Sequence, residues 1–422
     1  MIKFRKIIFV ILITVLINIS FAAKILIPMD RQQTDHLKAY GIVYWTLKHG
    51  QNVEWLLNYR GGSFLTDANS GLIDELRLRG VSFERPGNSA VMQIYSTIDK
   101  SNMDIALLEK AAKIAIYTPP NKQPWDDAVT LALTYAEIDY DKIWDRKVLD
   151  GKLTEYDWLH LHHEDFTGQF GKFYANYRNH KWYQDQKKQY EKMAQELGFE
   201  SVSQQKKAVA AKIKQYVEDG GFLFAMCAAT DALDIALASR GLDIVDRPFD
   251  GDPPDPNINE RLNYSNTLAF ENFKLYPNPM VYEFSDIDYP PSNDPVTRGA
   301  MADYFNLFQF SAKYDPVPTM LTQNHQNIVK GFMGQTTGFL RSKIKEQVVI
   351  LGEVKGGKQV KYLHGNQGQG TFTFLGGHDP EDYRHYVGDP KTRLELHKHS
   401  PGYRLILNNV LFPSAKKKER KT

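Results

Sequence analysis

The stretch at residues 220–238 places the only cysteine of this 422-residue chain between an apolar run and a helix-forming segment. The run at 222–226 is short and fully apolar, which is typical of a buried parallel strand. After Cys227, either Thr230 or Asp231 can cap a helix rich in Ala, Leu and Ile. The sequence therefore predicts a strand, a sharp turn that carries a thiol, and a helix start.

A thiol in this position has two interpretations. The positive end of the helix dipole and the nearby backbone N–H groups would lower the pKa of Cys227 and favour the reactive thiolate. A free cysteine at the end of a strand is also commonly a small, buried apolar residue. In the first interpretation, the backbone N–H of Ala228 helps to bind an oxyanion next to the nucleophile.

Strands and helices alternate along the first part of the chain, which predicts parallel strands joined by right-handed crossovers. The expected strands are at 24–29, 53–58 and 81–84, and the expected helices are at 36–48 and 71–79.

A second α/β pattern begins at Lys113 and repeats features of the segment at Lys24, including a tryptophan 31 residues later. The constant offset suggests two related α/β units, at 24–112 and 113–414. The common spacing of βαβ segments is the alternative explanation of this offset. The stretch from 243 to about 319 is rich in Pro and Asp, which predicts a long insertion in the second unit, at about 243–345.

The two ends of the chain have a different character. Residues 1–23 combine a basic start, an apolar core and small residues at the end, which predicts a cleaved signal peptide and export to the periplasm or the medium. An uncleaved anchor is the alternative, although the apolar run is short for a span. Residues 415–422 predict a solvated basic tail. With one cysteine, no intrachain disulfide can form.

Three polar clusters follow predicted strands, and ligands of parallel sheets bind at such strand ends. The clusters are His-His-Glu-Asp at 162–165, Cys227, and His-Asp-Pro-Glu at 378–381. In a nucleophilic mechanism, Cys227 attacks a carbonyl, His378 is the base and then the acid, and Glu381 orients the imidazole. The candidate ligand-binding groups are Ala228, His162, His163, Glu164, Asp165 and Arg60.

A metal site is the competing interpretation of the histidines. His160 and His162 share one face of a strand, because side chains alternate with a period of two. Together with His163, Glu164 and His378 they supply enough ligands for zinc with an open position. Because no His-Glu-x-x-His helix motif is present, our prediction contains no metal and no other cofactor. Hydrogen-bonded core histidines are the structural alternative.

From about Lys113 onward the chain resembles the class I glutamine amidotransferase-like superfamily, which has a flavodoxin-like α/β fold. The segment Gly-Gln-Gly-Thr-Phe-Thr-Phe-Leu-Gly-Gly-His-Asp-Pro-Glu at 368–381, with a later Asn-Asn at 408–409, resembles the trehalose-utilisation (ThuA-like) branch. The resemblance implies catalytic roles for Cys227, His378 and Glu381. Two alanines replace the usual glycines around the cysteine, and the His–Glu spacing is one residue longer than usual.

The whole chain also resembles exported bacterial proteins that carry the name asparagine synthetase B. That reaction requires a cysteine directly after the initiator Met, and residue 2 is Ile. It also requires a Ser-Gly-Gly-x-Asp-Ser loop for ATP, and none is present. The sequence does not support ATP-dependent asparagine synthesis.

Three functions remain open from the sequence. The first is a thiol hydrolase or amidase that uses Cys227. The second is a protein that binds a carbohydrate, peptide or other small molecule in the same crevice without catalysis. The third is a metal-dependent hydrolase that uses the cluster at 160–165. A net charge of +2 gives no indication of a nucleic-acid partner, and no stable membrane span is expected after signal cleavage.

Overall fold

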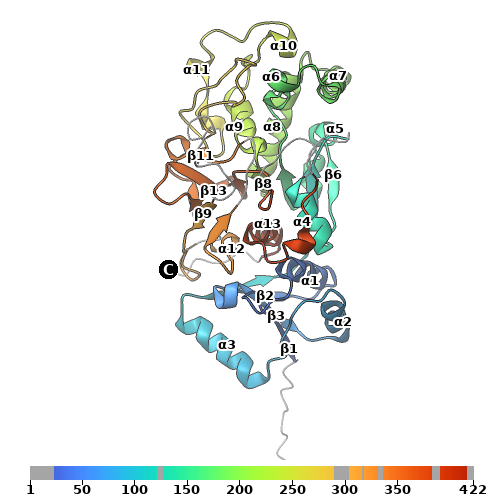
Figure 1. Cartoon of the computed structure of the whole chain (residues 1–422), viewed down its shortest axis with the longest axis vertical. Helices are drawn as coiled ribbons and strands as arrows, with labels where there is room; N and C mark the ends of the chain where they lie inside the picture. The colour runs from blue at the N-terminus through green and yellow to red at the C-terminus, as the bar shows by residue number, and fades with distance from the viewer. Residues whose placement is uncertain are drawn as a thin grey trace, which may run out of the picture.

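The computed structural model describes residues 23–120, 127–288, 304–315, 318–330, 336–382 and 390–415. The predicted signal peptide, apart from its last residue, and nearly all of the predicted basic tail lie outside these residues. The chain folds into two sheets separated by a layer of helices (Figure 1). The α/β class expected from the sequence is confirmed.

The first sheet has four strands in the order β1-β3-β2-β4, and every pair is antiparallel. The parallel arrangement expected for this unit is therefore wrong. A short turn joins β2 to β3, and such a connection permits only an antiparallel hairpin. The segment at 81–84 contributes one isolated bridge rather than a strand. The strands are β1 (Lys24–Ile27), β2 (Val53–Leu57), β3 (Ser63–Asp67) and β4 (Asp104–Leu108).

The second sheet contains five parallel strands in the order β6-β5-β7-β8-β14. Numbered along the chain, these strands have the order 2-1-3-4-5, which is the flavodoxin-like order. The expected flavodoxin-like arrangement of the second unit is thus confirmed. The strands are β5 (Ile114–Tyr117), β6 (Asp141–Ile143), β7 (Trp158–Leu161), β8 (Phe222–Met226) and β14 (Gly370–Leu375).

Antiparallel strands continue the second sheet beyond β14, in the order β13-β12-β9-β10, and β11 pairs with β13. Part of the predicted insertion therefore extends the edge of the sheet. These strands are β9 (Tyr304–Leu307), β10 (Ile328–Lys330), β11 (Phe339–Leu340), β12 (Val349–Glu353) and β13 (Gln359–Gln367).

Helices form three layers around the two sheets. The middle layer consists of α1, α4 and α13, whose apolar side chains share one core with strands of both sheets. Helices α8 and α9 cover the opposite face of the second sheet, and α3 covers the outer face of the first (Figure 1). These helices are α1 (His36–Lys48), α3 (Asn88–Lys100), α4 (Ala128–Ala136), α8 (Val202–Glu218), α9 (Ala228–Ala238) and α13 (Pro401–Leu411).

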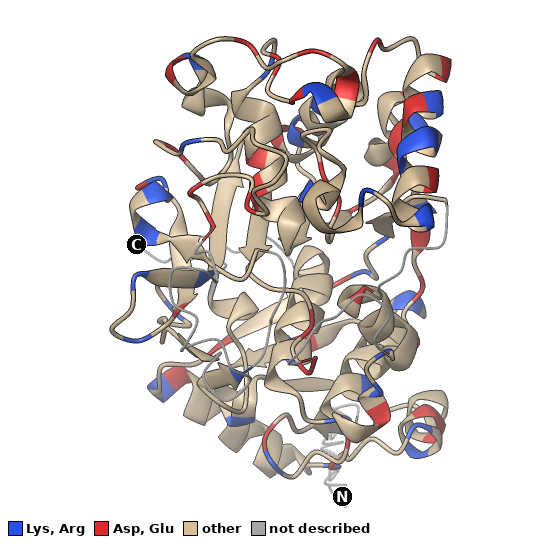
Figure 2. Ribbon diagram, turned by 45° about the horizontal axis from the view of Figure 1, so that its top comes forward, with Lys and Arg blue, Asp and Glu red and all other residues tan. Residues whose placement is uncertain are grey.

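The remaining helices lie around this framework. They are α2 (Ser70–Leu78), α5 (Asp145–Leu149), α6 (Tyr174–Tyr177), α7 (Lys181–Glu196), α10 (Arg247–Asp250), α11 (Ile258–Arg261) and α12 (Pro318–Leu321). Figure 2 shows both signs of charge interspersed along the outer helices. Within the described part of the chain, no helix combines the length and apolar character needed to cross a membrane.

Candidate active site

The backbone at Cys227 is held in a strained conformation between β8 and α9. Its φ of 48° and ψ of −139° lie in a region that residues with a side chain rarely adopt. The pairing of Met226 with Leu375 continues into a hydrogen bond from the N–H of Cys227 to the carbonyl of Gly377, at 3.0 Å. The predicted strand, turn and helix are present, and the turn has the sharp geometry of a nucleophile elbow.

The thiol lies inside the protein, since Cys227 is only 1% exposed. Burial raises the pKa of Tyr282, and a charge on Cys227 raises it further. Tyr282 belongs to the predicted insertion, so this segment passes near the thiol. Any substrate must therefore reach Cys227 through a narrow approach or after a local rearrangement.

A row of three buried imidazoles connects the ends of β7 and β14. His160 Nδ1 lies 3.0 Å from the carbonyl oxygen of Phe224, and His160 Nε2 lies 3.2 Å from His162 Nδ1. His162 Nε2 in turn lies 2.7 Å from His378 Nδ1. The expectation that His160 and His162 share a strand face is confirmed by this contact.

The carbonyl at one end of the row fixes the direction of its protons. The Phe224 oxygen can only accept a hydrogen bond, so His160 carries its proton on Nδ1. When all three rings are neutral, His162 donates from Nδ1 to His160 and His378 donates from Nδ1 to His162. The lone pair of His378 is then on Nε2, as a general base requires.

Asp127 lies beside the row and was not identified from the sequence. Its two carboxylate oxygens lie 3.6 Å from His160 Nε2 and His162 Nδ1. It also caps α4 by accepting hydrogen bonds from the N–H groups of Val129 and Thr130. Burial raises its pKa, but the two histidines and the backbone donors outweigh burial and lower the pKa of Asp127 well below its usual value. An aspartate at a helix start was a visible capping signal, but its contact with β7 was not.

The loop after β7 is hydrogen-bonded to the turn that carries Cys227. The carbonyl of His162 accepts a hydrogen bond from the N–H of Ala229 at 3.1 Å, while the N–H of His162 donates to Glu164. Ala228 is the first residue of α9, where a backbone N–H has no acceptor within the helix. The position predicted for the oxyanion donor thus lies between Cys227 and the histidine loop.

The two acidic residues of the loop differ. Burial raises the pKa of Glu164 to about 8, with the hydrogen bond from His162 opposing and the charge of Asp127 adding to the rise. Asp165 accepts hydrogen bonds from the N–H and hydroxyl of Thr167 and from the N–H of Gly171. Asp165 therefore holds the shape of the loop.

The predicted orienting residue, Glu381, has its Oε2 3.1 Å from Nδ1 of His397. At Nδ1 of His378, the structure places His162. The orientation of His378 is therefore explained by the histidine row, and the role of Glu381 stays a prediction.

Arg60 belongs to the first sheet, in the turn between β2 and β3. Its guanidinium donates to Asp30 at 2.6 Å and to Glu84 at 2.8 Å. This pairing joins the turn to neighbouring segments of the same unit, and the ligand contact of Arg60 stays a prediction.

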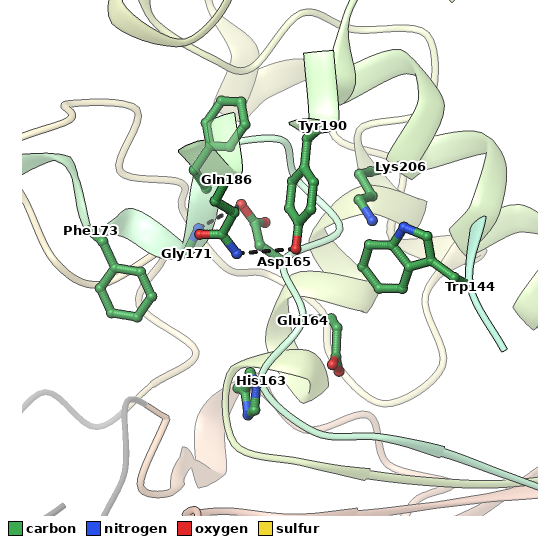
Figure 3. A pocket seen from close by; sticks show the side chains of 10 residues that line it. Trp144, His163, Glu164, Asp165, Gly171, Phe173, Gln186, Tyr190 and Lys206 are labelled. Atoms are coloured by element: carbon green, nitrogen blue, oxygen red, sulfur yellow. Dashed lines mark hydrogen bonds between the residues drawn. The ribbon is translucent and has the colours of Figure 1, made fainter. Parts of the chain in front are cut away.

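A small pocket of about 20 Å³, with room for about one water molecule, lies beside His163 and Glu164 (Figure 3). Trp144, Tyr190 and Phe173 supply its aromatic walls, and Lys206 lies 3.8 Å from the centre of the Trp144 indole. Two buried atoms of the lining, Trp144 Nε1 and Gln186 Oε1, have no hydrogen-bond partner among the described residues. These two atoms can therefore offer one donor and one acceptor to a water molecule or to a ligand group of similar size.

No protein-family model matches the chain, and no curated protein matches its sequence. Two solved cytoplasmic proteins of Salmonella typhimurium are similar over 72% of this chain and all of theirs, with 12% and 14% identity and TM-scores of 0.35 and 0.32. A β-galactosidase of Bacillus circulans is similar over 70% of this chain and 32% of its own, with 10% identity and a TM-score of 0.24. At these values the similarities carry no argument about function.

Proposed function

We propose that this protein is a thiol hydrolase that cleaves an amide or ester bond, with Cys227 as nucleophile and His378 as base. The observation that carries the proposal is the strained backbone of Cys227, hydrogen-bonded to the residue that precedes His378. Strain of this kind persists where the surrounding structure enforces it and is concentrated at active sites.

In the proposed reaction these groups act as follows. Sγ of Cys227 forms a bond to the substrate carbonyl carbon while its proton moves to Nε2 of His378. The same proton then passes to the leaving amine or alcohol as the C–N or C–O bond breaks. Water, activated by His378, hydrolyses the thioester. The N–H of Ala228 stabilises the oxyanion in both steps, and His162 keeps His378 in the required tautomer.

The flavodoxin-like strand order supports the proposed relation to the class I glutamine amidotransferase-like superfamily and its trehalose-utilisation branch. The basic and apolar start of the chain supports the proposed export. For the substrate, we propose a small molecule, carbohydrate or peptide, one small polar group of which binds in the pocket beside Glu164. The aromatic walls, together with the donor and the acceptor that Trp144 Nε1 and Gln186 Oε1 offer, support this choice.

The test is the rate at which iodoacetamide alkylates the folded protein as a function of pH, with a chelator present. The single cysteine makes Cys227→Ala a complete control for labelling. We expect alkylation well below the usual cysteine pKa of about 8.5, and a shift toward that value in His378→Asn. A thiol that reacts only after unfolding would overturn the nucleophilic mechanism and favour ligand binding without catalysis. Amide and ester substrates are then screened with Cys227→Ser as the inactive control.

A further inference from the structure

We propose that His162, His163 and His378 form a Zn²⁺ site, and that a bound Zn²⁺ inhibits the hydrolase by occupying its base. The binding site stands on its own geometry, whereas the inhibition rests on the proposed function.

The first support is the convergence of three imidazoles from two strand ends. One ring nitrogen from each lies within 4.8 Å of the others, and the rings of His162 and His378 are nearly perpendicular, at 87°. In tetrahedral zinc sites, Zn–N bonds of about 2.0–2.1 Å put ligand nitrogens roughly 3.3 Å apart. His162 Nε2 and His378 Nδ1, now 2.7 Å apart, need to separate by only about 0.6 Å.

The second support is the environment of the other ring nitrogen of His162, Nδ1. Its Nδ1 faces His160 Nε2 at 3.2 Å and a carboxylate oxygen of Asp127 at 3.6 Å. Zinc-bound histidines usually direct their second nitrogen at a carboxylate or another acceptor, which fixes the tautomer and raises ligand basicity. The same contacts leave the lone pair of His162 on Nε2, directed at His378.

The third support is the choice of ligand and the local charge. Imidazole nitrogens are common ligands of Zn²⁺, and a site with three protein ligands leaves one position for water. His162 and His378 are buried, and His163 is partly exposed toward the pocket. The carboxylate of Asp127 adds negative charge next to the cation.

Inhibition follows from the tautomer of His378. In the metal-free row, His378 donates from Nδ1 and keeps its lone pair on Nε2. A metal ion bound at Nδ1 moves the proton to Nε2, so the ring can no longer accept the proton of Cys227. The metal is then an inhibitor and not the catalyst.

Binding is tested first in the full-length Cys227→Ala protein, with Cys227→Ser as a second background, by isothermal titration with Zn²⁺. We expect one ion per chain. His163→Ala should weaken binding at least tenfold, and His180→Ala, which removes an exposed histidine on another element, should leave binding unchanged. Co²⁺ titration should give the intense visible bands of a tetrahedral site. Absence of saturable binding, or equal binding in His163→Ala, overturns the site.

Inhibition is tested by alkylation of the unsubstituted protein. We expect stoichiometric Zn²⁺ to slow labelling of Cys227 at least tenfold, EDTA to restore it, and His163→Ala to require far more Zn²⁺. Binding without slower labelling overturns the inhibition, and Zn²⁺-dependent hydrolysis by Cys227→Ala shows a metal hydrolase instead. If Zn²⁺ binds but the metal-free thiol never reacts, the proposed function fails and the metal site stands.

Discussion

The N–H of Cys227 donates to the carbonyl of Gly377 at 3.0 Å, which fixes the position of the thiol-bearing turn relative to the residue before His378. The two residues are 150 positions apart in the chain, but β8 and β14 are adjacent parallel strands. Because both turns continue the same pair of strands, the separation of the proposed nucleophile and base is set by the rigid centre of the sheet. Such a placement meets the demand of catalysis for groups held in fixed geometry.

Replacement of Cys227 by glycine tests the strain. Glycine adopts positive φ without penalty, so relief of strain should offset its greater loss of backbone entropy. We expect Cys227→Gly to be as stable as Cys227→Ala, or up to about 1 kcal/mol more stable, in urea unfolding. Ala225→Gly, in the extended part of β8, is the matched control and should be destabilised. Equal losses in both glycine variants would contradict the strained elbow.

The second sheet could be predicted from the sequence because its central strands are apolar runs that end in polar residues. The run at 222–226, the thiol and the helix start all appear as expected. The histidine row could be predicted in part, since strand alternation places His160 and His162 on one face of β7. The contact between His162 and His378 depends on the parallel order of β7, β8 and β14, which spacing alone does not give.

The arrangement of the first sheet could not be predicted from the sequence, although its turn could. Gly61 and Gly62, with φ of 77° and 86°, lie in the turn between β2 and β3 and mark it in the sequence. The strand that follows, Ser63–Asp67, was missed, and the antiparallel pairing with it. Asp127 was also missed, because only the folded sheet brings it beside β7.

Close packing between the two units predicts a severe effect of Gly41→Ala. A Cβ at this position would lie 1.8 Å from the carbonyl oxygen of Ala136, so α1 and α4 would have to separate. We expect a loss of roughly 3 kcal/mol or more in urea unfolding, because overpacking forces backbone shifts. Gly71→Ala, at a helical position of α2 with only ordinary contacts, should be neutral or stabilising. Similar stabilities for the two variants would contradict the close approach of α1 and α4.

The buried pair of Lys206 and Asp145 predicts an asymmetric response to substitution. Nζ of Lys206 lies 2.9 Å from Asp145, both side chains are almost fully buried, and Gln205 and Tyr117 also donate to the carboxylate. Asp145→Ala leaves an uncompensated buried charge, so we expect a loss of about 3–5 kcal/mol. The double variant Lys206→Met/Asp145→Leu should be clearly more stable than Asp145→Ala in the same urea titration. A double variant that is no more stable would show that the pair contributes through its hydrogen bonds and not its charge balance.

A buried histidine between the two units predicts loss of stability in acid. Burial, with Arg404, His325 and His399 adding, lowers the pKa of His36 to about 2. The folded chain therefore keeps His36 neutral between about pH 3 and 6, while the unfolded chain protonates it below about 6.5. Since the unfolded state binds more protons in this window, the free energy of unfolding should fall as pH falls, by up to about 1.4 kcal/mol per pH unit from this residue.

The measurement compares urea unfolding at pH 7 and pH 5 for His36→Gln and for His180→Gln, whose histidine is exposed. His36→Gln should be less stable at pH 7, because His36 Nε2 lies 2.9 Å from the carbonyl of Asp30 and 3.1 Å from that of Met29. The free energy of unfolding of His36→Gln should nevertheless fall less between pH 7 and pH 5 than that of the unsubstituted protein. The difference should correspond to the uptake of about one proton by the unfolded state. His180→Gln should keep the full dependence. If the free energy of unfolding fell equally with pH in both variants, the acid sensitivity would arise from another residue. His325, whose pKa is lowered to about 3 by burial and Arg404, would then be the next residue to replace.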